Sequence, residues 1–318
     1  MPNRPAILVF AYHDVGHECL DALIRRREKI IAVLTHQDDP NEEIWFRSVA
    51  NLARRNGIPV YTPTSVNTPE WTRRIREWKP DLIFSFYYRN MINAEILHLP
   101  RLGAFNMHGS LLPKYRGRAP INWAVLRGEK ETGVTLHHMV RRADAGDIVD
   151  QQAVPIGPDD TALDVFRKAT VAAREVIERQ IDAIKQGTAP RTAQDESQAT
   201  YFGGRRPEDG RIDWTDSAEG IFNLVRAVTH PYPGAFTEVN GMRLVIWLAK
   251  PLPEGSGTPG QVLSIAPLRV AAGAGMLEIV KYQWDGSPEQ YASSGIHGLR
   301  KGQLLGAGAI TVNDGRMP

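Results

Sequence analysis

The first half of the chain alternates short apolar runs with amphipathic stretches. Apolar runs of strand length lie at residues 6–11, 30–34, 59–61 and 81–87, and apolar residues at helical spacing fill the intervals. A strand that is apolar on both sides is typical of a sheet covered by helices on both faces. Strands that alternate with helices of this length predict right-handed βαβ units. We therefore expect an α/β domain with a Rossmann-like, mostly parallel sheet.

A long amphipathic helix is expected to close this domain. Asp159 and Asp160 mark its start, since negative charge is favourable at the positive end of a helix. Apolar residues then keep helical spacing as far as Gly187, a residue typical of the position after a helix C-terminus.

The pattern changes in the second half. Residues 188–206 are polar and irregular, which is typical of a linker. A short helix is predicted over 218–228, and Asn240-Gly241 between two apolar runs is a strong hairpin signal. Strands are predicted at residues 235–239, 242–248, 260–265, 268–272 and 276–280. Five short strands with tight turns favour a small β-barrel of the OB type.

The patterns divide the chain into three parts. Residues 1–189 form the predicted catalytic domain, residues 190–206 a linker, and residues 207–318 an OB-like β-barrel domain. The last stretch, 302–318, is rich in glycine and weakly patterned.

Polar side chains interrupt the apolar pattern at one place in the first half. Residues 103–107 form a predicted buried strand, and Asn106 and His108 are two apart, so both leave the same face. A second apolar run at 133–140 is followed by Asp144, which we expect at the end of a neighbouring strand, within reach of the imidazole. An amide, an imidazole and a carboxylate aimed at one point predict an acyl-transfer site.

Composition narrows the classes of protein. A chain of 318 residues can bury two cores, and a formal net charge of +2 argues against a large nucleic-acid surface while allowing a local patch for an anion. One cysteine, Cys19, excludes an internal disulfide and suits a reducing compartment. The first apolar run is too short for a signal peptide or membrane span, so we expect a cytoplasmic protein without membrane insertion.

Several cofactors are disfavoured by the motifs. The turn after the first strand contains only Gly16, whereas a dinucleotide fingerprint needs three spaced glycines, and the chain has no P-loop. NAD and FAD are therefore not expected. His137 and His138 are adjacent on a predicted strand and face opposite sides, so we expect no shared metal site.

The motif Asn106-x-His108-x-Ser110-Leu-Leu-Pro113-x-Tyr115-Arg116-Gly117, followed by Asp144-Ala-Gly146-Asp147, closely resembles the folate-dependent formyltransferases. This family includes the methionyl-tRNA, glycinamide ribonucleotide and sugar N-formyltransferases. Residues 10–14, 84–89 and 111–120 are most similar to the formyltransferase half of the ArnA-type bifunctional polymyxin-resistance proteins. The resemblance covers residue 6 to about residue 280.

The resemblance implies an activity and roles for residues. It implies formyl transfer from 10-formyltetrahydrofolate to the primary amine of a nucleotide sugar, first of all UDP-4-amino-4-deoxy-L-arabinose, in lipid A modification. Asn106 would stabilise the transition state, His108 would carry the proton, and Asp144 would raise the pKa of His108. Folate contacts are implied at Asn90, Met91, Ile92, Arg118, Val140, Arg141, Arg142, Ala143 and Asp144.

The motif indicates less clearly which residues bind the amine substrate that accepts the formyl group. Lys114, Tyr115 and Arg116 lie in the basic loop of the motif and are candidates for contact with the substrate and its phosphates, because guanidinium pairs with phosphate in a bidentate way. The alternative is that this basic loop only interacts with solvent. Tyr87 and Tyr88 either line the folate cleft or belong to the core.

Three functions compete at this point. The first is a nucleotide-sugar N-formyltransferase, with UDP or dTDP as the nucleotide. The second is a tRNA formyltransferase, which would need a basic surface for nucleic acid. The third is a non-catalytic regulatory module that binds folate or a nucleotide sugar. Because the chain ends at Pro318, without the UDP-glucuronic acid decarboxylase half of the ArnA-type proteins, we expect a stand-alone formyltransferase whose decarboxylase partner would be a separate polypeptide.

Overall fold

The computed structural model describes residues 4–40 and 42–306, which form two compact units. The first unit comprises the described residues up to Pro120, with Glu131–Pro155 and Phe166–Tyr201; the second comprises Ile121–Lys130, Ile156–Val165 and the described residues from Phe202. The sequence pattern divides the chain at one linker, whereas here two inner segments belong to the second unit. The end of the predicted glycine-rich tail, 307–318, lies outside the described residues.

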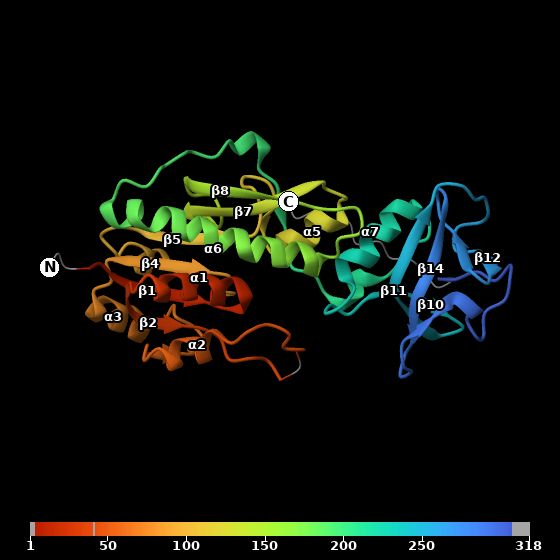
Figure 1. Ribbon diagram of the computed structural model, residues 1–318, viewed down its shortest axis with the longest axis horizontal. Coiled ribbons are helices and arrows are strands. Elements are labelled where there is room, and N and C mark those ends of the chain that lie inside the picture. The colour runs from red at the N-terminus through yellow and green to blue at the C-terminus, as the bar shows by residue number, and fades with distance from the viewer. Residues whose placement is uncertain (1–3, 41, 307–318) are drawn as a thin grey trace. The chain divides into compact units, whose positions relative to one another are not determined.

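A seven-stranded sheet forms the centre of the first unit (Figure 1). Its strands, in spatial order, are β3 (Val60–Tyr61), β2 (Lys29–Leu34), β1 (Ala6–Ala11), β4 (Leu82–Phe86), β5 (Ala104–His108), β7 (Glu131–His138) and β8 (Ile148–Pro155). The first five are parallel, β7 is antiparallel to β5, and β8 is antiparallel to β7. The predicted mostly parallel α/β sheet is confirmed.

Helices cover both faces of this sheet. α1 (His13–Arg25) and α6 (Ala162–Gln186) lie side by side across the strands in Figure 1, and Arg26 at the end of α1 donates to Asp182 of α6 at 2.5 Å. The opposite face packs on α3 (Pro69–Trp78) and α4 (Ala94–Leu97). Two seven-residue helices complete the set before α6, namely α2 (Val49–Arg55) and α5 (Pro120–Leu126).

The face packed on α3 and α4 also positions the polar residues of β5. Leu8, Ile83 and Ala104 belong to one buried apolar cluster on this face. Because side chains alternate along a strand, Asn106 and His108 leave the same face as Ala104. The apolar packing of this face therefore gives way to polar side chains as β5 proceeds, while Phe105 and Met107 stay buried on the other side.

The second unit is built on an antiparallel sheet, against which α7 (Ala218–Val228) packs. Its strands, in spatial order, are β10 (Ala235–Val239), β11 (Met242–Leu252), β14 (Met276–Trp284), β13 (Leu268–Ala271) and β12 (Val262–Ile265), with β15 (Gln290–Tyr291) beside β14. Asn240 and Gly241 both have positive φ, 51° and 79°, as the predicted hairpin turn requires. The unit is rich in antiparallel strands, as expected of a small β-barrel domain.

Several shorter elements complete the described chain. β6 (Arg116–Gly117) pairs with β9 (Tyr201–Phe202), and 3₁₀ turns lie at Glu196–Gln198, Pro207–Gly210 and Ala292–Ser294. Within the described part of the chain, none of the helices has the length and apolar character that a membrane crossing requires.

Candidate active site

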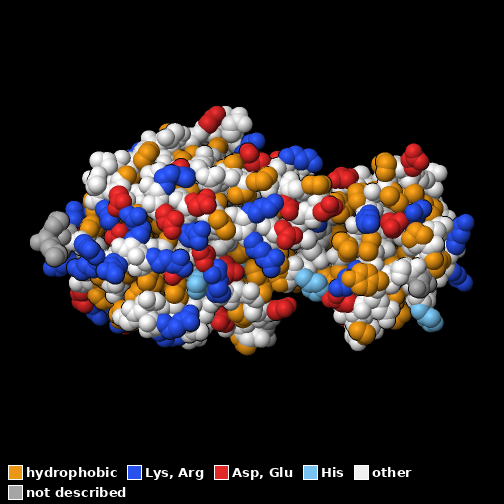
Figure 2. Space-filling model, viewed as in Figure 1, with side chains coloured by type: hydrophobic (Ala, Val, Ile, Leu, Met, Phe, Trp, Pro, Cys, Tyr) orange, Lys and Arg blue, Asp and Glu red, His pale blue; other side chains and the backbone are white. Residues whose placement is uncertain are grey.

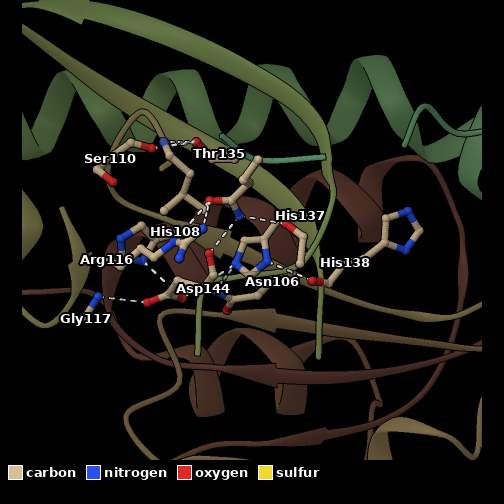
Figure 3. Close-up of polar contacts among 12 residues, drawn as sticks. Asn106, His108, Ser110, Arg116, Gly117, Thr135, His137, His138 and Asp144 are labelled. Carbon is tan, nitrogen blue, oxygen red and sulfur yellow. Dashed lines mark hydrogen bonds and ion pairs between the residues drawn. The ribbon is translucent and has the colours of Figure 1, made fainter. Parts of the chain in front are cut away.

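The site is built on one face of the sheet between β5 and β7. The antiparallel register places Asn106 opposite His137 and His108 opposite Thr135. Residues opposite one another in an antiparallel pair point to the same side, so these four polar side chains share a face (Figure 3). His138 follows on the other face, and its ring is directed away from the cluster in Figure 3.

Asp144 reaches this face from the hairpin loop 139–147. The sequence places it at the end of a strand beside the end of β5. In fact β7 is antiparallel, so its last residue lies beside the start of β5, at Phe105. The loop folds back on β7, where His138 N–H donates to the Asp147 carbonyl at 2.9 Å. This brings Gly146 so close to the His138 carbonyl that a Cβ at position 146 would collide with it.

The carboxylate of Asp144 lies near the imidazoles of both His108 and His137. Its Oδ1 is 3.5 Å from Nδ1 of His108 and 3.6 Å from Nε2 of His137. Its Oδ2 accepts a hydrogen bond of 2.9 Å from the backbone N–H of Gly117. The three groups expected from the sequence therefore converge, and His137 joins them as a fourth.

The tautomer of His137 follows from its partners. Nδ1 lies 2.9 Å from the carbonyl of His138, which can only accept, so Nδ1 carries the proton. In the neutral ring, Nε2 is then an acceptor for the Nδ2 amide of Asn106 at 3.1 Å. One N–H of the Asn106 amide is used in this way, and the second remains for another acceptor.

His108 is buried and has an acceptor at each ring nitrogen. Its Nε2 lies 2.8 Å from the carbonyl of Tyr115, and Nδ1 faces Asp144. Burial lowers the pKa of His108 below its ordinary value, while the Asp144 carboxylate and the Tyr115 carbonyl act to raise it. The expected direction of the Asp144 effect holds, but desolvation is larger, so the net pKa shift of His108 is downward rather than upward.

The pKa of Asp144 moves in the opposite sense to the effect of its burial. Burial alone would raise it, but the His108 and His137 rings in their protonated form and the N–H of Gly117 outweigh burial and hold the pKa of Asp144 well below its usual range. Asp144 is therefore a permanent negative charge beside His108 at neutral pH.

Backbone strain is concentrated around this site. Non-glycine residues with positive φ follow β1, β4, β5 and β7 in the chain: His13 (64°), Tyr87 (56°), Tyr115 (58°), Ala119 (51°) and Asp144 (54°). Such conformations cost energy and are found most often at functional sites. The ends of parallel strands in an open α/β sheet are also where ligands bind.

Comparison with protein families identifies the fold and the chemistry together. The family model described as formyl transferase matches residues 3–181, and the model for the formyl transferase C-terminal domain matches residues 205–300. The chain belongs to the formyl transferase family. It is therefore a formyltransferase, and its Asn106, His108 and Asp144 lie within the first match.

Solved structures share the fold of this formyltransferase. An N-formyltransferase from Helicobacter canadensis, in complex with folinic acid and dTDP-3-aminofucose, has 22% identity and a TM-score of 0.68 over 87% of this chain and 99% of its own. A sugar 3N-formyltransferase determined with dTDP and 5-N-formyl-THF has 21% identity and a TM-score of 0.68 over 90% and 100%.

A longer protein also contains this fold. HypX from Aquifex aeolicus, in complex with tetrahydrofolic acid, has 20% identity and a TM-score of 0.62. The match covers 92% of this chain but 47% of HypX, so the formyltransferase fold spans about half of that protein.

The expected folate residues of the formyltransferase lie on two loops and on the motif loop. After β4, Asn90 and Met91 are exposed, and Ile92 is buried in the apolar cluster under α3 and α4. After β7, the side chains from Val140 to Ala143 are exposed, and Arg142 donates to Glu196 at 3.0 Å. Arg118 is exposed on the loop after β5.

The expected substrate residues do not lie together. Lys114 is exposed, whereas the side chain of Arg116 is fully buried. Its guanidinium donates to Gln194, Glu196 and Tyr201 at 2.5–3.1 Å. In this structure, protein partners therefore bind the guanidinium that was expected to contact phosphate. Tyr115 contributes its backbone carbonyl to His108.

Two contributors to the site were not anticipated from the sequence. His137 was considered only as a metal ligand, because its position opposite Asn106 depends on the register of β7. Gln194 lies in the predicted linker, yet its Nε2 donates to the carbonyl of Asp144 at 2.8 Å. Among the described residues, no group of three or more His, Cys, Asp or Glu is arranged to hold a metal ion.

Proposed function

We propose that this formyltransferase transfers the formyl group of 10-formyltetrahydrofolate to the primary amine of a nucleotide-linked amino sugar. The observation that carries the proposal is the convergence of Asn106, His108 and Asp144 on one face of the sheet, in a member of the formyl transferase family.

Asn106 is proposed to stabilise the charge that develops during transfer. As the amine adds to the formyl carbon, the formyl oxygen gains negative charge, and the free N–H of the Asn106 amide is a suitable donor for it. The hydrogen bond to His137 fixes the orientation of that amide. A single preorganised donor of this kind is worth about 10²–10³ in rate.

His108 and Asp144 are proposed to move the proton. Burial lowers the pKa of His108 and keeps the ring neutral near pH 7, with Nε2–H donated to the Tyr115 carbonyl. Nδ1 then has the lone pair that accepts the proton lost by the amine as the new C–N bond forms. The Asp144 carboxylate and the Tyr115 carbonyl then stabilise the imidazolium. The same proton can be returned to N10 of the folate as its bond to the formyl carbon breaks, which leaves His108 in its starting state.

The two loops predicted to contact folate have suitable surfaces. The side chains of Met91 and Val140 are 58% and 44% exposed, so each loop offers apolar surface for contact with an aromatic pterin. Structures that share this fold were determined with folinic acid, 5-N-formyl-THF or tetrahydrofolic acid.

The acceptor is proposed to be a nucleotide sugar because two of these structures contain dTDP or dTDP-3-aminofucose. UDP-4-amino-4-deoxy-L-arabinose is our first candidate, on the resemblance to the ArnA-type proteins, and a dTDP-linked amino sugar fits the fold relatives equally well. The small net charge of +2 supports a small-molecule acceptor over tRNA.

A formylation assay tests the proposal. Purified protein and 10-formyltetrahydrofolate are offered UDP-, dTDP- and GDP-linked amino sugars in parallel with charged initiator tRNA, and the formylated product is measured by mass spectrometry. Formylation of one nucleotide sugar, and not of the tRNA, is the expected result. Formylation of tRNA alone would refute the sugar substrate, and binding of a ligand without turnover would favour the regulatory module.

A further inference from the structure

Residues 192–201, which we call the strap, contact both loops that build the site. At one end, Thr192 exchanges two backbone hydrogen bonds, of 2.8 and 2.9 Å, with Ile148 at the start of β8. At the other end, Thr200 accepts from Tyr115 N–H at 2.8 Å through its hydroxyl and from Arg116 N–H through its carbonyl. The strap is therefore anchored beside the loop that bears Asp144 and beside the loop that contacts His108.

Gln194 lies in the strap between these two loops. Its Oε1 accepts from Nε and Nη2 of Arg116 at 3.1 and 2.7 Å. Its Nε2 donates to the carbonyls of Asp144 and Gly146 at 2.8 and 2.7 Å. An amide side chain has two acceptor sites and two donor hydrogens, so the whole hydrogen-bonding capacity of Gln194 is spent on these two loops.

Arg116 gives Gln194 a fixed support. Its side chain is completely buried, and the guanidinium also donates to both carboxylate oxygens of Glu196 and to the hydroxyl of Tyr201. Bidentate guanidinium–carboxylate pairs are geometrically specific. Arg116 is therefore fixed within the loop after β5, and its hydrogen bonds fix Gln194 relative to that loop.

Asp144 needs such a support. Its φ of 54° lies in the left-handed region, which is unfavourable for a non-glycine residue and persists only where surrounding contacts hold it. Gln194 binds the backbone carbonyl of Asp144, and Gly117 N–H binds its carboxylate. Arg116, which binds Gln194, and Gly117 are adjacent in the chain. Both contacts therefore hold Asp144 against the same short segment.

We propose that Gln194 is a positioning residue for formyl transfer, which links Arg116 to the backbone of Asp144 and thereby sets the separation between the Asp144 carboxylate and the His108 imidazole. This inference rests on the proposed function of the site.

The positioning role has a consequence that a merely structural contact lacks. The charged and titratable groups that face His108 are Asp144, His137 and Arg116, and among them Asp144 is the one that favours the imidazolium. Loss of Gln194 lets Asp144 move away from the ring, so His108 binds its proton less tightly. The acidic limb of the pH–rate profile should then move to lower pH.

The test compares Gln194→Ala and Gln194→Met with Gln198→Ala. Gln198 is exposed in the same strap and serves as the matched control. Both Gln194 variants should lower kcat by about 10- to 100-fold, since small misplacements of catalytic groups have effects of this size, with little change in KM. Gln194→Met keeps the length of the side chain and adds no charge but removes its hydrogen bonds to both loops, so it reports on position even if Gln194→Ala folds poorly. Gln198→Ala should match the wild type.

A double-mutant cycle and a substrate-free measurement decide the outcome. If Gln194 acts through Asp144, Gln194→Ala should have little further effect on kcat in the Asp144→Asn background. The NMR titration of the His108 ring in the free protein should move to lower pH in both Gln194 variants and not in Gln198→Ala. An unchanged ring titration in both Gln194 variants would overturn the inference. A shifted titration in a protein that formylates no amine would support the positioning role and refute the proposed function.

Discussion

His108 meets an acceptor at each ring nitrogen, the Tyr115 carbonyl at Nε2 and the Asp144 carboxylate at Nδ1. Burial favours the neutral ring as the starting state, and the two acceptors stabilise the imidazolium once a proton is bound. A histidine in a purely apolar pocket would have the first property without the second. This balance of desolvation against a fixed charge suits a group that must both take and return a proton.

Replacing His108 by alanine should remove the proton carrier and leave the folate loops intact. We expect kcat to fall by about 10²–10⁴-fold, the range found for general acid–base groups. Calorimetry with 5-formyltetrahydrofolate should give nearly the same affinity for variant and wild type. Equal turnover by the two proteins would remove His108 from the mechanism.

Asp144→Asn should change the pH dependence in a defined direction. In the proposed mechanism His108 must be neutral to accept the proton, so the rate should fall as pH drops through the pKa of His108. Burial puts that limb below the ordinary value of about 6.5. The amide no longer stabilises the imidazolium, so the pKa and the acidic limb should move to still lower pH while the plateau rate decreases. A limb that stays in place, or moves to higher pH, would contradict the coupling.

At the scale of elements, the strands and helices with strong patterns were predicted and the weakly patterned ones were not. The apolar run 6–11 is β1 itself, and α7 occupies the predicted 218–228. β8 escaped prediction because it carries Asp150, Gln151 and Gln152 at its centre, as an edge strand can when one side faces solvent. α5 follows directly on the Gly- and Pro-rich motif loop, which masks its start.

The hairpin loop 139–147 should depend on the absence of a side chain at Gly146. An alanine there would meet the His138 carbonyl, a backbone atom that cannot turn aside. Gly146→Ala should therefore displace Asp144, lower kcat, and cost on the order of 1–3 kcal/mol of stability.

Gly203→Ala is the matched control for this substitution, because nothing lies within 4 Å of its added Cβ. Its stability should stay within about 0.5 kcal/mol of the wild type. Activity assays and thermal unfolding of both variants check the pair. A Gly146→Ala protein with wild-type turnover would show that the loop does not have to hold this conformation.

At the scale of the whole molecule, net charge and its distribution indicate which partners a protein can bind, but they do not indicate its fold. Basic and acidic side chains are interspersed on the face shown in Figure 2, as a formal net charge of +2 suggests. Many arginines on the first unit are paired, such as Arg89 with Glu42 and Arg179 with Asp150. Paired charges give little net attraction for a polyanion.

Salt dependence should therefore be shallow. A protein that contacts many nucleic-acid phosphates loses roughly 10³–10⁵ in affinity between about 50 and about 200 mM salt. We expect KM for a nucleotide sugar to change by no more than about tenfold over that range, because few phosphates are involved. Excess charged initiator tRNA should not inhibit. Strong inhibition by tRNA that disappears at high salt would revive the tRNA formyltransferase.

The sequence by itself determined the fold class and the family, and it predicted that Asn106, His108 and Asp144 come together, as they do in the structure. Periodicity reports which side of an element is buried, and the motif keeps its residues close along the chain, so both can be recognised without coordinates. Tertiary structure alone decided how Asp144 arrives, that His137 stands opposite Asn106, that Arg116 is buried, and that Gln194 ties the two loops together. Each of these depends on strand register or on residues far apart in the chain, here Arg116, Asp144 and Gln194. Local pattern carries no information about such pairings, because side chains distant in sequence meet only after the sheet and its loops have formed.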